Sequence, residues 1–62
     1  MNTTPEMVTI TVDDLIHETD AAWLFDVAGS EVWLPKSNCE YTPGRIKTVE
    51  VPEWLAIDKG LV

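Results

Sequence analysis

Few side chains in this 62-residue sequence could perform covalent or acid–base chemistry. Nucleophilic catalysis needs a thiol or hydroxyl with a base within hydrogen-bond reach, and nothing in the sequence places the single histidine, His17, beside the single cysteine, Cys39. A structural zinc site takes about four Cys or His ligands, more than the chain offers. We therefore expect no enzymatic activity, no metal and no cofactor, with His17 on the surface and Cys39 as an inert thiol.

Carboxylates are the remaining chemical groups, and four of them fall close together in the sequence. They are Asp13, Asp14, Glu18 and Asp20. Their spacing does not match a calcium-binding EF-hand loop, and consecutive residues of a strand, such as Asp13 and Asp14, point to opposite faces. Two interpretations stay open: a solvated acidic edge that protects strands from aggregation, or an acidic face that binds a partner.

The charges are distributed unevenly along the chain. Residues 1–35 contain seven acids and no Lys or Arg, and they account for the whole net charge of −7 because the four acids and four bases of residues 36–62 cancel. Binding to phosphate backbones relies on clustered Lys and Arg, whereas an acidic surface accelerates encounter with a basic protein surface. The charge therefore favours a basic protein as partner, unless it serves only solubility.

Three tryptophans, Trp23, Trp33 and Trp54, combine a large apolar area with a hydrogen-bond donor. In one interpretation all three form the core of a chain that has few other bulky residues. In the other, one of them is exposed and anchors an interface.

A small basic and aromatic group lies in the electrically neutral half. Its members are Lys36, Tyr41, Arg45 and Lys47. Such a group could stack on and clamp a nucleotide or a single strand, although its cations are few beside the eleven acids of the chain.

The elements that must position these residues are mostly strands. Residues 7–12 alternate apolar residues with threonines, which predicts a half-buried strand. Asp13 and Asp14 interrupt the alternation, so we expect a bend or bulge there. The polar run over residues 17–20 is interpreted as a turn.

Residues 21–34 predict a hairpin. Residues 21–27 are largely apolar on both faces, which is typical of a central strand, and residues 28–30 supply a tight reversal before a returning strand over residues 31–34. Pro35 cannot donate to a ladder, so regular pairing should end or reach a sheet edge there.

A second hairpin is predicted in the C-terminal half. Residues 39–41 alternate weakly, and residues 42–45 match a type II turn with Pro in its second position and Gly in its third. Residues 46–51 should form the last strand, with Val49 and Val51 on one face.

A short helix is predicted over residues 52–59, because proline favours the first helical position and Gly60 suits the C-terminal end. After a flexible N-terminus at residues 1–6, we expect one small, mainly β domain over residues 7–62. Its strands, about four or five, should form a small curled antiparallel sheet or a barrel of SH3-like or OB-fold size. A chain this small without disulfides usually needs a dense core or self-association, so a homo-oligomer is one option.

No basic segment followed by an apolar run opens the chain, and no stretch approaches the roughly 18 apolar residues of a membrane span. A single cysteine also suits a reducing compartment. We expect a cytoplasmic protein that does not bind membranes.

Three segments carry a resemblance to known sequences: residues 18–25 (ETDAAWLF), residues 31–37 (EVWLPKS) and residues 51–61 (VPEWLAIDKGL). Together they resemble a pattern of short uncharacterised phage and prophage proteins: E-T-[ED]-K-A, then a turn that contains Gly, then E-x-W-[LI]-P-K-S, then V-x-E-W-[LF]-A-x-x-K-G-L. Ala21 stands where that pattern has a lysine. The resemblance implies a viral or prophage origin, with the host-cell cytoplasm as the location, and it implies no activity or ligand.

These observations favour a non-enzymatic phage-type interaction protein. It would bind and occlude a host protein with a basic surface, in host takeover or anti-defence, through its acidic half and an exposed aromatic residue, and it would mimic the charge of nucleic acid. The alternatives are a nucleotide or single-strand binding module built on the basic and aromatic group, and a structural accessory that acts as a homo-oligomer.

Overall fold

The computed structural model describes residues 6–62, and within them the chain is mainly β with one short C-terminal helix, as the sequence predicts. The flexible segment expected at residues 1–6 lies outside the described residues except for Glu6. The elements in chain order are β1 (Met7–Val12), β2 (Asp14–Glu18), β3 (Ala22–Val27), β4 (Ser30–Pro35), β5 (Glu40–Thr42), β6 (Lys47–Pro52) and α1 (Glu53–Asp58).

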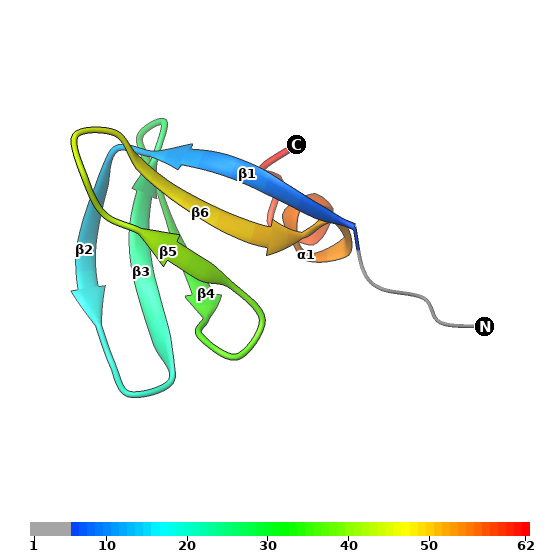
Figure 1. Ribbon diagram of the computed structural model, residues 1–62, viewed down its shortest axis with the longest axis horizontal. Helices are drawn as coiled ribbons and strands as arrows, with labels where there is room; N and C mark the ends of the chain where they lie inside the picture. Colours follow the sequence, from blue (N-terminus) through cyan, green and yellow to red (C-terminus); the bar gives the residue numbers. More distant parts are fainter. Residues whose placement is uncertain (1–5) are drawn as a thin grey trace.

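The strands form two antiparallel sheets of three strands each, in the orders β1-β6-β5 and β2-β3-β4. The first sheet crosses over the second, and α1 lies beside β1 and β6 at one end of the molecule (Figure 1). The sheets share one corner, because the chain passes from β1 through Asp13 directly into β2. A strand that bends from one sheet into the next is a usual corner of packed sheets.

The expected interruption at the aspartates is confirmed, whereas the turn predicted over residues 17–20 is partly wrong. His17 and Glu18 belong to β2, and only the residues that follow form the turn. β2 is an edge strand, in which polar side chains can be solvated while the strand stays paired. The polarity of His17 and Glu18 therefore does not indicate a turn. The register of β2 against β3 also shifts between Leu15 and His17, which leaves Ile16 as the extra residue of a β-bulge.

The hairpin predicted over residues 21–34 is confirmed, with β3 as the central strand of its sheet. Its loop has two residues, Ala28 and Gly29, with φ of 52° and 86°, and is one residue shorter than the reversal expected over residues 28–30, because Ser30 already pairs with Val27. Positive φ at both positions is the type I′ geometry that matches the twist of paired strands. Pro35 is the last residue of β4, which is a sheet edge as expected.

The second hairpin also forms, but not with a type II turn. β5 pairs with β6 across a loop over residues 43–46, and the φ of Gly44 is 158°, far from the roughly +80° of a type II turn. β6 starts at Lys47, so Ile46 lies in the loop. Val49 and Val51 share the buried face of β6, as predicted.

The helix is shorter than the predicted range of residues 52–59. Pro52 ends β6 and caps the helix with ψ of 142°, outside the helical range, and the Glu53 amide donates to the Glu6 carbonyl at 2.7 Å. At the C-terminal end Gly60 has φ of 72°. The Leu61 amide bonds the Ala56 carbonyl at 2.8 Å. This is the pattern of a Schellman motif, and it returns Leu61 to the core.

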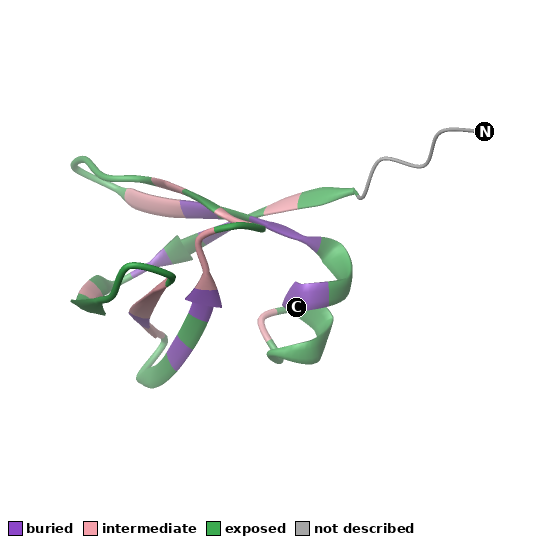
Figure 2. Cartoon of the chain, turned by 90° about the horizontal axis from the view of Figure 1, so that it is seen from below, coloured by how far each residue is buried: buried purple, intermediate pink, exposed green. Residues whose placement is uncertain are grey.

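The core lies between the two sheets and extends to α1, with buried residues along the inward sides of the strands and on the helix (Figure 2). Its members are Ile10, Val12, Phe25, Val32, Leu34, Val49, Val51, Leu55 and Ala56. No polar or charged residue among residues 6–62 is buried. Any binding groups must therefore be sought on the outer surfaces of the sheets and the helix.

Candidate interaction surface

The side chains of the β2-β3-β4 sheet that point away from the core form what we call the outer face. Phe25, Val32 and Leu34 are buried, so their neighbours in β3 and β4 point outward, because side chains alternate along a strand. The pairing register arranges the outer-face residues in two rows. They are His17, Leu24 and Trp33 in one row and Asp14, Asp26 and Glu31 in the other.

The first row is an aromatic platform. His17 pairs with Leu24, and Leu24 pairs with Trp33. The His17 and Trp33 rings lean together over Leu24 in an edge-to-face arrangement, with centroids 6.1 Å apart and planes at 89°. Trp33 is nevertheless 44% exposed. A large aromatic side chain is thus held in a fixed orientation while much of its surface faces water.

The second row consists of carboxylates only. Asp14 pairs with Asp26, and Asp26 pairs with Glu31, so three acids lie side by side across the sheet. Like charges that are directly opposite destabilise a sheet. No lysine or arginine forms an ion pair with them, since the one ion pair among residues 6–62 joins Lys36 to Glu18. The acidic row is next to the platform, because Glu31 and Trp33 are alternate residues of β4.

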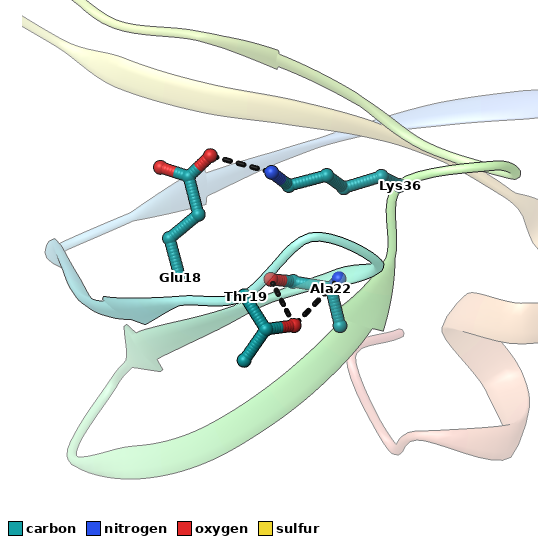
Figure 3. Close-up of polar contacts among 4 residues, drawn as sticks. All are labelled: Glu18, Thr19, Ala22 and Lys36. Atoms are coloured by element: carbon teal, nitrogen blue, oxygen red, sulfur yellow. Dashed lines mark hydrogen bonds and ion pairs between the residues drawn. The ribbon is translucent and has the colours of Figure 1, made fainter.

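The four acids singled out in the sequence do not form one face. Only Asp14 belongs to the outer face. Glu18 pairs with Lys36, 2.5 Å from carboxylate oxygen to Nζ, beside the turn in which Thr19 Oγ1 accepts from the Ala22 amide at 3.1 Å (Figure 3). Asp20 is exposed in that turn.

Asp13 has a structural role at the corner between the sheets. Its Oδ2 accepts a hydrogen bond from the Ala28 amide at 2.8 Å, and its own amide donates to the Asp26 carbonyl at 2.8 Å. These bonds tie the corner to the loop of the β3–β4 hairpin. The outer face therefore takes Asp14 from the predicted group and adds Asp26 and Glu31. Those two acids pair because the hairpin loop has two residues. The reversal expected over residues 28–30 would have placed Glu31 opposite Val27 instead, so the sequence interpretation missed this pair.

The three tryptophans have different surroundings, so the interpretation that all three form the core is wrong. Trp23 packs against the core, with its ring centroid 5.9 Å from the centroids of both Phe25 and Tyr41. Trp33 is on the outer face, and Trp54 of α1 is 54% exposed. Ile57, also exposed, is one helical turn from Trp54.

The basic and aromatic group is divided between two ends of the molecule. Lys36 follows β4, with Nζ 5.5 Å from the centroid of the Trp23 ring, against which Tyr41 also packs. Lys47 instead pairs with Val12 at the shared corner, close to the loop end of the β3–β4 hairpin, and Arg45 is exposed in the adjacent loop. The chain therefore does not gather all four side chains into one cluster.

His17 and Cys39 also lie in different surroundings. The His17 ring contacts Trp33 on the outer face, whereas Cys39 is half-buried against the core. Burial raises the pKa of the Cys39 thiol, which is opposite to the lowered pKa of a reactive cysteine. Within residues 6–62 no group of three or more His, Cys, Asp or Glu side chains is placed to hold a metal ion.

Within residues 6–62 no helix has both the length and the apolar character that crossing a membrane requires. The resemblance to short phage and prophage proteins stays a prediction. When the chain is compared with known proteins, no family model, no curated protein and no solved structure matches it.

Proposed function

We propose that this chain is a non-enzymatic interaction protein whose outer face binds and covers a basic surface of a partner protein. The observation that carries the proposal is the exposed Trp33 platform directly beside the acidic row of Asp14, Asp26 and Glu31. An aromatic residue in a rigid setting is the usual centre of a protein interface. A row of uncompensated carboxylates beside it selects partners of positive charge.

The arrangement of the acids supports binding over solubility alone. Solubility needs charges of either sign spread over the surface. Here three carboxylates are aligned across adjacent strands, where like charges oppose one another. Asp26 Oδ1 accepts from the Gly29 amide at 3.2 Å and Asp14 Oδ1 from the Leu15 amide at 2.9 Å, but neither bond supplies a positive charge. A basic partner would relieve that repulsion, so the arrangement is unfavourable in the free protein and favourable in the complex.

The partner we propose is a host protein. The resemblance to short phage and prophage proteins supports a bacterial host cytoplasm as the location. Covering a basic surface, such as one that receives nucleic acid, would block its function by charge mimicry and would serve host takeover or anti-defence. The partner is thereby defined by its chemistry, a folded protein with a basic site.

A homo-oligomer is the second candidate, and the exposed pair Trp54 and Ile57 on α1 favours it. If that pair joins two copies, light scattering should show a dimer that Trp54→Ser converts to a monomer. Binding of a nucleotide or single strand has less support, because Lys36 is already engaged by Glu18 and lies over Trp23.

Affinity capture from a bacterial lysate with matched variants tests the proposal. Glu31→Lys changes a carboxylate on edge strand β4 that pairs with Asp26, and Glu40→Lys changes one on edge strand β5 that pairs with Glu50. Both variants alter the net charge equally, and both replace an acid–acid pair by an acid–base pair. We expect Glu31→Lys and Trp33→Ser to lose a captured basic protein that wild type and Glu40→Lys retain. Equal capture by all four proteins would contradict the proposal.

A further inference from the structure

The free edge of β4 lies directly beside the aromatic platform and the acidic row. The Lys36 amide donates to the Ala21 carbonyl at 2.8 Å and so continues the ladder between β3 and β4. Hydrogen-bonded positions alternate along an antiparallel strand. The backbone N–H and C=O groups of Val32 and Leu34 therefore point toward β3 and bond it. The backbone groups of Glu31 and Trp33 then face away from the sheet, and their amides have no hydrogen-bond partner within residues 6–62.

Among the free edges, β4 is the one suited to accept another strand. β2 is interrupted by its bulge, and β5 has three residues. β1 has six residues, but the outward-facing side chains in its middle are threonines, which provide neither charge nor aromatic surface. β4 has six residues, regular pairing throughout, and Glu31 and Trp33 as its outward side chains.

We propose that β4 takes up an extended segment of the basic partner as an additional antiparallel strand, an inference that rests on the proposed function. The backbone of the segment forms hydrogen bonds with the N–H and C=O groups of Glu31 and Trp33, which point toward the free edge. A Lys or Arg of the segment lies opposite Glu31 and places a positive charge at the end of the acidic row, which has none of its own. Two residues away, an apolar side chain of the segment packs on the Trp33 ring.

Charge decides between a basic segment and a second copy of this chain as the occupant. Opposite charges stabilise a cross-strand pair, and like charges directly opposite destabilise it. A second copy that paired Glu31 with Glu31 would bring another acidic row directly opposite the first, and in every register it would add another net charge of −7. A segment with alternating Lys and apolar residues brings the opposite charge and the same period of two as β4.

The test uses a blocked peptide, Lys-Thr-Val-Thr-Lys-Thr, whose central Val and following Lys would lie opposite Trp33 and Glu31. The matched control is the same peptide with N-methyl groups on that Val and that Lys. The methyl groups remove the two donors and stand between the strands, so that the peptide carbonyls cannot reach the Glu31 and Trp33 amides, while every side chain and charge is kept. Amide hydrogen exchange of the whole chain is followed by NMR, together with the chemical shifts of the Trp33 indole.

With the unmodified peptide we expect exchange of the Glu31 and Trp33 amides to slow by about tenfold at roughly 90% saturation, because only the free tenth exchanges. The N-methylated peptide should give no such protection. If both peptides shift the Trp33 indole equally without protecting the amides, strand addition is overturned while the proposed function stands. If neither peptide shifts the indole or protects the amides, strand addition is overturned, and the proposed function is decided by the capture experiment with Glu31→Lys and Glu40→Lys. Protection without peptide that grows with protein concentration would identify a second copy as the occupant and overturn the basic segment.

Discussion

At the residue scale, the carboxylates of this chain divide into those that hold the fold together and those that remain available. Asp13 accepts the Ala28 amide and thereby fixes the corner between the two sheets, and Glu18 pairs with Lys36. Asp14 and Glu31 face outward without a cation. The carboxylates therefore do not act as one acidic face. Variants that test function without disturbing the fold should be made at the available ones.

The structural role of Asp13 predicts a loss of stability on its removal. Asp13→Ala deletes the acceptor of the Ala28 amide, so the free energy of unfolding should fall by about 1 kcal/mol, the usual worth of one hydrogen bond. Asp20→Ala is the matched control, because Asp20 is exposed in a turn. Urea denaturation measures both. Equal stability of the two variants would show that the Asp13 bond contributes nothing.

Cys39 predicts a defined dependence on pH. Burial raises the pKa of its thiol, so the folded state holds the proton more tightly than the unfolded state does. The resulting stabilisation is present below the ordinary pKa of a cysteine, about 8.5, and is lost as pH rises through the raised value. The rate of alkylation by iodoacetamide should therefore reach its midpoint at higher pH in the folded chain than in urea. A midpoint at lower pH would contradict the assignment.

At the element scale, the β3–β4 hairpin is the unit that builds the outer face. Its two-residue loop places Asp26 opposite Glu31 and Leu24 opposite Trp33. That loop also holds Ala28 at φ of 52°, where residues other than glycine, asparagine and aspartate are strained. The hairpin therefore retains a local strain that a substitution can relieve.

Ala28→Asn should raise the free energy of unfolding by about 1 kcal/mol, because asparagine tolerates the left-handed region and is favoured in type I′ loops. Ala21→Asn, in a turn where φ is not positive, should give no gain. Thermal and urea unfolding of the two variants measure the difference. A destabilised Ala28→Asn would mean that the loop does not have the type I′ geometry.

The existence of the hairpin was predictable from the sequence because its signals are local: a strand that is apolar on both faces, then small residues over 28–30, then a returning strand ended by Pro35. Its register was not, because Ser30 pairs with Val27 instead of lying in the loop. The polar end of β2 was not, since an edge strand tolerates His17 and Glu18 without any apolar pattern. The aromatic platform depends on the bulge at Ile16 as well. Without the extra residue, Ile16 would pair with Leu24 and His17 would point toward the core, and no sequence pattern marks that shift.

At the scale of the whole molecule, two thin sheets enclose a core of aliphatic residues and one phenylalanine. The core takes few of the large aromatic side chains, which leaves Trp33 and Trp54 exposed. Composition could not decide this, because the number of tryptophans is the same whether they fill the core or cover a surface. The uneven charge was visible in the sequence, but its alignment into one row came from the pairing register.

The salt dependence of association with a captured basic partner decides whether the outer face recognises that partner through its acidic row. If the acidic row steers the encounter, the association rate should fall steeply between low and physiological ionic strength, where the Debye length is about 8 Å. Glu31→Lys should slow association and weaken this salt dependence, whereas Glu40→Lys, with the same change in net charge, should remain close to wild type. Association rates that are independent of salt, or that fall equally in both variants, would show that the outer face does not recognise the partner.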